Sequence, residues 1–449
     1  MKLGVLFSGG KDSVFACSRA MEDNQVACLI TLVSENPDSY MFHTPNIRST
    51  ELQAGALGLP RLVWPTQGRK EEELQDLALA LAVARDRYAI QGVVTGAIES
   101  VYQAARVQRI CRDLGLWCFC PLWQTNQVDY LRLLLKKGYL IIISGVYAYP
   151  FDASWLGAAI TEERVSKLQL LQEKYKINPS GEGGEIETFV LDGPIFHRRI
   201  EIQKARAIYA NYRGHFVIDE MRLVDKPQTK KGMATNGESS ANEKSSANSD
   251  PNVPEKRTNC DGAILLIDLC FKPDSLSRYE FVNPIMDSLH ELGHSTRVLH
   301  YSQITSQAID RSKGVILCGT ALQDNDYAAH PDAFSWIKRC KRPLLGICAG
   351  MQVISAVYGG SIVPHQSIGL ANIEVLQNSI LLGVPHSFEG YHLHNYAATL
   401  PDNFEILAGT KEALDAFCHA SNPTYGIIFH PEVRNRWILK RFADLSDNY

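Results

Sequence analysis

The sequence lacks the features that mark membrane proteins, disulfide-rich secreted proteins and strongly basic nucleic-acid-binding proteins. No apolar run approaches the roughly 20 residues that span a bilayer, and YLIIISGVYAY at 139–149 is too short. The 11 cysteines are scattered and the first residues show no signal-peptide pattern, so we expect a cytoplasmic protein. The formal net charge of −4 gives no sign of the excess positive charge with which proteins bind nucleic-acid phosphates. We therefore expect neither a membrane nor a nucleic acid as partner.

Metal-binding cysteine pairs are also missing. The closest cysteines, Cys118 and Cys120 in WCFCPLW, do not form a C-x-x-C pattern. Their apolar surroundings predict two buried thiols on a strand. We therefore expect no metal site built by protein side chains.

Large apolar residues are nearly absent from one internal stretch of the chain. From Val224 to about Asn259 the sequence is rich in Ser, Asn, Lys and Glu. Such a segment cannot bury enough surface to offset the entropy of ordering it. It predicts a disordered linker over 225–260 between a first domain, 1–224, and a second domain, 261–449. A chain of 449 residues is too long for one core, which agrees with two domains.

Short apolar runs alternate with amphipathic stretches in both predicted domains. In the first, helices are expected over 70–88 and 101–115. Buried parallel strands are expected at 3–7 (LGVLF), 27–33 (ACLITLV), 92–97 (GVVTGA) and 139–146 (YLIIISGV), and further strands in the second domain at 262–269, 314–319 and 342–348. This alternation predicts a doubly wound α/β sheet in each domain.

A glycine turn follows the first predicted strand in SGGKDS, residues 8–13. Gly9 and Gly10 can bring backbone N–H groups up to phosphate oxygens, and the following helix offers its positive N-terminal end. Lys11 adds a charge, and Ser8 and Ser13 add hydroxyl donors. The spacing is neither G-x-x-x-x-G-K-[ST] nor G-x-G-x-x-G. The loop resembles the pyrophosphate loop of the PP-loop ATPases, which have an adenine-nucleotide hydrolase-like fold and split ATP into AMP and pyrophosphate.

Two further stretches narrow the acceptor of the adenylate. Residues 96–111 (GAIESVYQAARVQRIC) follow a predicted strand, at the edge where open α/β sheets bind ligands. Residues 179–196 place Glu182, Glu185 and Glu187 around two glycines. Such carboxylates repel one another unless a cation lies nearby, although a solvated acidic loop is the simpler alternative.

With MFHTPN (41–46), PLW (121–123) and SWLGAAI (154–160), these stretches resemble the diphthine–ammonia ligase family across residues 1–224. The resemblance implies that ATP, with Mg²⁺, adenylates the diphthine carboxylate of elongation factor 2, and that ammonia displaces AMP. It implies ATP binding by Ser8, Gly9, Gly10, Lys11, Asp12, Ser13 and Gly96, and acceptor binding by Tyr102, Gln103, Glu182, Glu185 and Glu187. We add the hypothesis that these carboxylates attract the trimethylammonium group of diphthine.

The second domain contains a cysteine between a predicted strand and a predicted helix. Cys348 in GICAGMQ has the strand–turn–helix setting of a nucleophile elbow. Downstream, His430 in FHPE can accept the thiol proton and Glu432 can orient its imidazole.

This set resembles the class I glutamine amidotransferases over residues 261–445, which have a flavodoxin-like fold and release ammonia from glutamine. The resemblance implies that Gly319 and Gln352 bind glutamine. Thr320 stands where many members have a second glycine of the oxyanion hole, which predicts a weaker hole and a slower glutaminase.

Together these features predict an ATP-dependent amide ligase, a diphthine–ammonia ligase, supplied with ammonia by its own glutaminase. GMP synthetase joins the same two domain types in the opposite order. Three alternative hypotheses stay open. In the first, the enzyme amidates another carboxylate, for example in cobalamin-related metabolism. In the second, it is a tRNA-modifying PP-loop enzyme, and in the third, the second domain is a regulatory module that binds without hydrolysing. The missing C-x-x-C pairs and the negative charge speak against the tRNA enzyme.

Overall fold

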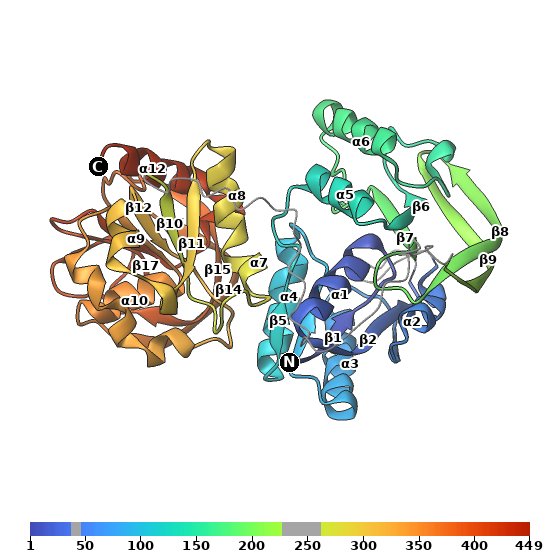
Figure 1. Ribbon diagram of the computed structural model, residues 1–449, viewed down its shortest axis with the longest axis horizontal. Coiled ribbons are helices and arrows are strands. Elements are labelled where there is room, and N and C mark those ends of the chain that lie inside the picture. The colour runs from blue at the N-terminus through green and yellow to red at the C-terminus, as the bar shows by residue number, and fades with distance from the viewer. Residues whose placement is uncertain (37–45, 227–261) are drawn as a thin grey trace, which may run out of the picture.

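The computed structural model describes residues 1–36, 46–226 and 262–449. Figure 1 shows two parts side by side: the first, blue to green, is formed by the first two ranges, and the second, yellow to red, by the third. The linker predicted over 225–260 lies outside the described residues, apart from Lys226 and Asp225, the last residue of a strand. The stretch 41–46 also lies outside them, apart from Asn46.

The central sheet of the first part is parallel, with the strand order β3-β2-β1-β4-β5. The strands are β1 (Lys2–Leu6), β2 (Gln25–Ser34), β3 (Arg61–Thr66), β4 (Gly92–Val94) and β5 (Trp117–Phe119), and the helices between them are α1 (Lys11–Asp23), α2 (Thr50–Leu57), α3 (Glu73–Tyr88) and α4 (Val101–Asp113). The strand order changes direction between β1 and β4. The loops after these two strands therefore border the switch point where open α/β sheets bind ligands.

A second sheet in the first part is antiparallel, with the order β7-β6-β9-β8. Its strands are β6 (Leu140–Val146), β7 (Ile186–Asp192), β8 (Arg198–Ala210) and β9 (Arg213–Asp225), accompanied by α5 (Gln127–Lys136) and α6 (Glu162–Tyr175). The run at 139–146 forms β6, so its expected parallel pairing is wrong. An apolar run indicates burial on both faces of a sheet, but it does not determine the direction of the neighbouring strands.

The second part is built on a seven-stranded sheet with the order β11-β10-β12-β13-β18-β17-β16, in which the first five strands are parallel. Its strands are β10 (Ile264–Asp268), β11 (Thr296–His300), β12 (Gly314–Leu317), β13 (Leu344–Ile347), β16 (Phe404–Gly409), β17 (Leu414–His419) and β18 (Thr424–Ile427); β14 (Ile362–Glu374) and β15 (Ser387–Ala398) pair as a separate hairpin. Its helices are α7 (Arg278–Phe281), α8 (Asn283–Glu291), α9 (Ser306–Arg311), α10 (Ala349–Val357), α11 (Pro431–Arg434) and α12 (Arg436–Asp447). Short 3₁₀ turns complete the two parts: η1 (Ile47–Ser49), η2 (Ala153–Trp155), η3 (Tyr301–Gln303), η4 (Asp326–Ala329) and η5 (Pro331–Arg339). The predicted α/β class, with a parallel sheet in each part, is confirmed.

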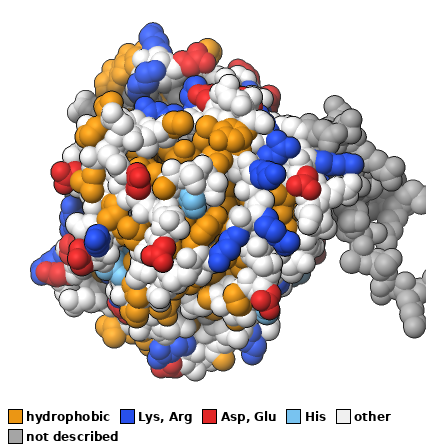
Figure 2. All heavy atoms as spheres, turned by 90° about the vertical axis from the view of Figure 1, so that its left-hand side faces the viewer, with side chains coloured by type: hydrophobic (Ala, Val, Ile, Leu, Met, Phe, Trp, Pro, Cys, Tyr) orange, Lys and Arg blue, Asp and Glu red, His pale blue; other side chains and the backbone are white. Residues whose placement is uncertain are grey.

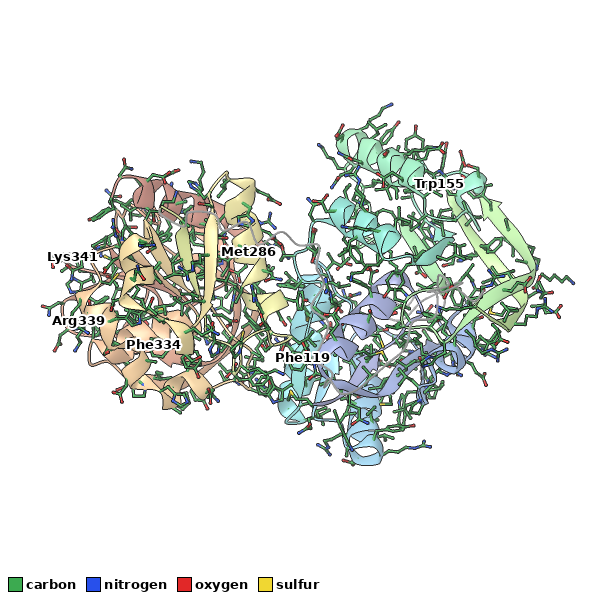
Figure 3. The ribbon with its side chains drawn as sticks, in the orientation of Figure 1. Phe119, Trp155, Met286, Phe334, Arg339 and Lys341 are labelled. Atoms are coloured by element: carbon green, nitrogen blue, oxygen red, sulfur yellow. The ribbon has the colours of Figure 1, made fainter. Side chains whose placement is uncertain are left out.

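The two parts meet along α4 and β5. Arg109 Nη2 donates a hydrogen bond to the Ile368 carbonyl at 2.9 Å, and the Trp117 ring centroid lies 5.0 Å from that of Phe271. One hydrophobic cluster runs across the junction from Ala104 and Ala105 of α4 to apolar residues of the second part, Phe281, Ile368 and Tyr391. Figure 3 labels Phe119 on the first part and Met286 on the second, on either side of this junction.

The end of the second part that faces away from the junction forms an outer face. Figure 2 shows this face, where hydrophobic side chains gather between charged side chains of both signs. Figure 3 places Phe334, Arg339 and Lys341 at the same end. The predicted nucleophile is instead close to the junction, because the hydrophobic cluster that crosses the junction includes Tyr391 and Leu393, which contact the residues around Cys348.

Candidate functional site

The predicted nucleotide loop connects β1 to α1. Gly9 has φ +81°, and a Cβ atom there would lie 2.2 Å from Gln53 Oε1. The Gln53 amide donates to the Gly9 carbonyl at 2.9 Å and to the Val190 carbonyl at 2.8 Å, and so ties the loop to β7. The loop therefore needs glycine at position 9 for its backbone and for the space that Gln53 fills.

Lys11 lies at the start of α1 and is 2% exposed. Its ammonium group donates to Asp12 Oδ2 at 2.9 Å and to the Ser180 carbonyl, and its backbone N–H donates to Thr188 Oγ1 at 3.1 Å. Lys11 therefore connects the nucleotide loop, residues 8–13, to residues 179–196, the acidic stretch that contains the three glutamates. A buried cation beside a helix N-terminus forms a strong electrostatic site for an anionic ligand.

The loop after β4 packs directly on the nucleotide loop. A Cβ atom on Gly96 would lie 2.8 Å from the Asp12 carbonyl carbon and 2.9 Å from the Ser13 nitrogen. Ser13 Oγ donates to the Gly10 carbonyl at 3.0 Å, and Ser8 Oγ lies 3.3 Å from Ser13 Oγ. The predicted ATP-binding residues therefore gather at the switch point between β1 and β4.

The three glutamates of the acidic stretch have different partners. Glu182 Oε1 accepts from the backbone nitrogens of Ile98, Glu99 and Ser100 at 3.1, 2.9 and 2.9 Å, so it holds the loop that begins α4. Burial raises the pKa of Glu182 against these hydrogen bonds, which lower it. Glu185 Oε1 accepts from both the backbone and the side chain of Asn178, at 2.9 Å each.

Glu187 is the glutamate whose pKa is affected by the charge of Lys11. Burial raises the pKa of Glu187 to about 8, and the Lys11 ammonium acts in the opposite direction. Glu187 Oε2 is buried without a hydrogen-bond partner among the described residues, as is Oε2 of Glu185. These two oxygens are therefore buried acceptors of the acidic stretch whose hydrogen-bonding capacity is unused within the described residues.

Tyr102 and Gln103 lie in the first turn of α4. The Tyr102 hydroxyl donates to Glu71 Oε1 at 2.9 Å, and the Arg106 guanidinium lies 3.4 Å from the centre of the ring. The Gln103 backbone N–H donates to Ser100 Oγ, which caps the helix. Beside them a cleft of about 700 Å³ is lined by Tyr102, Arg106 and Arg109 from the first part and by Gly369, Leu370 and Arg434 from the second. Tyr102 therefore faces a space shared by the two parts.

Cys348 forms the predicted sharp turn between β13 and α10. Its φ is +52°, which is rare for a residue with a side chain, and the thiol is 3% exposed. A Cβ atom on Gly346 would lie 2.5 Å from the Gly350 backbone, and one on Gly350 would lie 2.3 Å from the Leu317 carbonyl oxygen. Both glycines are needed for the helix to pack on the strands, as in a nucleophile elbow.

His430 and Glu432 lie beside this turn. His430 Nδ1 and Glu432 Oε1 are 2.8 Å apart, and both side chains are buried. Burial lowers the pKa of His430, but the Glu432 carboxylate and the Cys348 thiol outweigh it and raise the pKa to about 10. Nε2 of His430 has no hydrogen-bond partner among the described residues and remains available to exchange a proton with the thiol.

The two predicted glutamine-binding residues, Gly319 and Gln352, both lie close to Cys348, but the Gln352 side chain already has hydrogen-bond partners. A Cβ atom on Gly319 would lie 2.8 Å from His430 Cε1 and 3.5 Å from Cys348 Cβ, so Gly319 lines the site. The Gln352 amide already donates to the Tyr396 carbonyl at 2.8 Å and accepts from the Tyr327 hydroxyl. Gln352 therefore holds the walls of the site together, and its predicted contact with glutamine stays a prediction.

Sequence reasoning missed several residues that shape both sites. Gln53, Asn178, Ser180 and Thr188 hold the nucleotide loop and the acidic stretch, and Tyr327 holds Gln352. Ser180 and Thr188 lie within the recognised stretch 179–196 and Asn178 lies next to it, whereas Gln53 and Tyr327 stand in no recognised motif. Cys118 and Cys120 are buried, as predicted, and interaction between the two thiols raises the pKa of Cys120.

The fold and the two sites define an α/β protein of two parts, one with a PP-loop-type nucleotide loop and one with the cysteine–histidine–glutamate set of a glutamine amidotransferase. Residues 1–118 match the diphthamide synthase N-terminal domain, 126–224 the diphthamide synthase C-terminal domain, and 277–438 the class-I glutamine amidotransferase domain.

Diphthine–ammonia ligases of Rattus norvegicus and Homo sapiens are 35% and 30% identical to the chain over 228 and 227 residues, which is 46% of this chain and 85% of each relative. The chain belongs to the diphthine–ammonia ligase family.

The second part has relatives of another kind. A glutamine-hydrolyzing GMP synthase subunit of Methanothrix thermoacetophila is 38% identical over 96 residues, 20% of this chain and 53% of that protein. A solved structure named for a GMP synthase subunit of Thermoplasma acidophilum has 26% identity and a TM-score of 0.38, and covers 42% of this chain and 95% of that one. Among the described residues, no helix combines the length and the apolar character needed to cross a membrane.

Proposed function

We propose that the protein is an ATP-dependent diphthine–ammonia ligase that obtains its ammonia from glutamine. Membership of the family supports the ligase reaction. The observation that carries the proposal is the meeting of the nucleotide loop and the acidic stretch at Lys11, at the switch point of the sheet. A site of this kind can hold ATP phosphates on one side and an acceptor on the other.

In the first step, the residues of the loop 8–13 hold ATP through backbone N–H groups and Lys11. A carboxylate oxygen of diphthine on elongation factor 2 attacks the α-phosphorus, the bond to the bridging oxygen of the β-phosphate breaks, and pyrophosphate leaves. Lys11 and the N-terminus of α1 stabilise the charge that develops on the phosphates. Glu185 would face the trimethylammonium group of the acceptor, whereas Glu187, whose neutral form is favoured by burial, would attract this group less.

The expected Mg²⁺ would accompany ATP. The described residues contain no cluster of three ligating side chains that could form a protein cage. Oδ1 of Asp12, buried without a hydrogen-bond partner beside the phosphate loop, fits a cation held mainly by phosphate oxygens. When bound, the ion would neutralise charge on the leaving pyrophosphate.

In the second part, the Cys348 thiolate attacks the side-chain amide carbon of glutamine. The C–N bond breaks, His430 gives its proton to the leaving nitrogen, and ammonia departs from a glutamyl thioester that water then hydrolyses to glutamate. The ammonia attacks the acyl adenylate, AMP leaves and the amide loses a proton. The paired His430 and Glu432 beside Cys348 support hydrolysis over a purely regulatory second part.

Replacing the nucleophile tests this proposal. In Cys348→Ala, glutamine should no longer support amide formation on diphthine-containing elongation factor 2, while ammonium should support it at a rate within about twofold of the unchanged protein. Mass spectrometry of the acceptor measures both reactions. Cys418→Ala, at a partly buried cysteine of β17, is the matched control and should use both nitrogen sources. Undiminished use of glutamine by Cys348→Ala would disprove the glutaminase role, and no amidation with either source would disprove the ligase.

A further inference from the structure

A carboxyl group is buried where the two parts meet. Glu280, in α7, is 3% exposed. Its Oε1 accepts from Gln108 Nε2 at 2.9 Å and its Oε2 accepts from the Cys120 backbone N–H at 3.2 Å. Both donors belong to the first part. A carboxyl group is rarely buried unless it is fully hydrogen-bonded, so this group depends on the first part for its stability.

The residue after Glu280 reaches the predicted catalytic histidine. Phe281 is 1% exposed, and its ring centroid lies 5.7 Å from that of His430. Tyr391 packs against the same imidazole, with ring centroids 6.2 Å apart, and its carbonyl accepts from the His430 backbone N–H at 2.8 Å. The position of Phe281 therefore fixes one wall of the pocket that holds His430.

The helix that carries both residues is too short to hold itself in place. α7 has four residues and no side-chain cap. A single helical turn is unstable on its own, so tertiary contacts decide where it lies. Two contacts hold α7 across the junction: the carboxyl of Glu280 is buried between Gln108 and Cys120, and the Arg19 guanidinium lies 4.9 Å from the centre of the Tyr279 ring.

Helix α4, which carries Gln108, also borders the other candidate site, the nucleotide site of the first part. The loop before α4 is held by Glu182 of the acidic stretch.

Burial raises the pKa of Glu280 to about 8, against the Cys120 hydrogen bond and the His430 charge, which lower it. Glu280 is thus affected by the charge of His430, and its neighbour Phe281 packs against the His430 ring.

We propose that Glu280 is a positioning residue of the glutaminase site, and that Gln108 and Cys120 of the ligase part hold it so that His430 is correctly placed only while the two parts are docked. This inference rests on the proposed glutaminase function. It makes the ligase part a component of the glutaminase site, so that ammonia is released efficiently only next to the site that consumes it.

Three variants of the full chain test this role by their release of glutamate from glutamine. Gln108→Met keeps the length of the side chain but leaves Glu280 Oε1 buried without its donor. Because small misplacements of catalytic groups are costly, kcat should fall about tenfold with KM for glutamine within about twofold. Glu280→Gln should keep at least about half of kcat, because its amide oxygen can accept from Cys120 and its amide nitrogen can donate to a rotated Gln108 amide.

Arg109→Met is the matched control. It lies next to Gln108 on α4 and loses a different contact between the parts, the hydrogen bond to Ile368. Its kcat should stay within about twofold of the unchanged protein. Amidation supported by ammonium, measured on the same preparations, should be unaffected in Gln108→Met and Glu280→Gln, because neither residue lines the cleft beside Tyr102.

The role of Glu280 is overturned if Gln108→Met leaves kcat unchanged, if Arg109→Met lowers it equally, or if only KM changes. If Gln108→Met does not fold, the double variant Gln108→Glu with Glu280→Gln decides, because it reverses the polarity of the pair. If the double variant keeps nearly full kcat, the positioning role of Glu280 is supported. If the double variant loses kcat, that role is overturned. An unchanged protein that uses ammonium but releases no glutamate would instead contradict the proposed glutaminase, and this inference with it.

Discussion

At the scale of single residues, both candidate sites bring a cation and a carboxyl group together in a buried place. In the first site the charge of Lys11 lowers the pKa of Glu187, and in the second His430 is paired with Glu432. The two pairs have opposite consequences. Burial keeps Glu187 largely neutral near pH 7, whereas Glu432 keeps His430 charged. The Lys11 ammonium is therefore paired with Asp12 rather than with Glu187, whereas Glu432 stabilises the imidazolium form of His430.

ATP binding should depend on the protonation of Glu187. The pKa of about 8 means that the carboxyl is neutral below this pH and ionises above it. The ionised form competes with the triphosphate for Lys11, so the Kd for ATP should rise by about three- to tenfold between pH 7 and pH 9. Glu187→Gln, which imitates the neutral form, should bind ATP equally well at both values. Isothermal titration calorimetry measures this, and an equal rise in both proteins would refute the role of Glu187.

Glutamine hydrolysis should depend on the charge that Glu432 places beside His430. Because the pKa of His430 is raised to about 10, the imidazolium is lost only at strongly alkaline pH. Glu432→Gln removes the main cause of this rise, so the alkaline limb of glutamate release should move to lower pH. The rate at pH 8 should fall by about ten- to a hundredfold. The pH–rate profile tests this, and a limb at the same pH would show that Glu432 does not control the histidine.

At the scale of secondary-structure elements, the sequence predicted what is encoded locally. The runs at 3–7 and 92–97 form β1 and β4, the amphipathic stretch 101–115 forms α4, and the turn at Cys348 has the predicted strand–turn–helix form. The pairing direction of β6 was wrong, and the hairpin of β14 and β15 was not foreseen. Strand partners lie far apart in the sequence, and their side-chain patterns do not reveal which neighbour they will meet.

The start of α4 should depend on Glu182, which comes from outside the helix. Glu182→Ala removes the acceptor of three backbone N–H groups and leaves them without that partner. We expect a loss of about 1–3 kcal/mol in the free energy of unfolding. Glu99→Ala, at an exposed residue of the same loop, should change it by less than about 0.5 kcal/mol. Urea denaturation compares the two, and equal losses would mean that Glu182 does not hold the helix.

At the scale of the whole molecule, the contact between the parts is the feature that the sequence could not predict. Glu280 lies in SLSRYEFVNP, a stretch without a recognisable motif, and its partner Gln108 is separated from it by more than a third of the chain. The motifs GICAGMQ and FHPE indicated a glutaminase, and SGGKDS indicated a nucleotide site. Only the packed structure shows that α4 borders both sites.

The two parts should stay together when the chain between them is cut. The junction combines buried apolar residues with the Glu280–Gln108 hydrogen bond, the Arg109 contact and the packing of Trp117 near Phe271. Contacts of this kind hold without a covalent connection when they bury enough apolar surface. A protease site inserted between residues 227 and 261 should therefore give two fragments that elute together in size-exclusion chromatography and still use glutamine for amidation. Trp117→Ala in the same cut protein should weaken the association, because it removes a large apolar contact at the edge of the junction. Fragments that separate fully without this substitution would show that the junction holds only while the chain is continuous, and glutamine use should then fall while ammonium use persists.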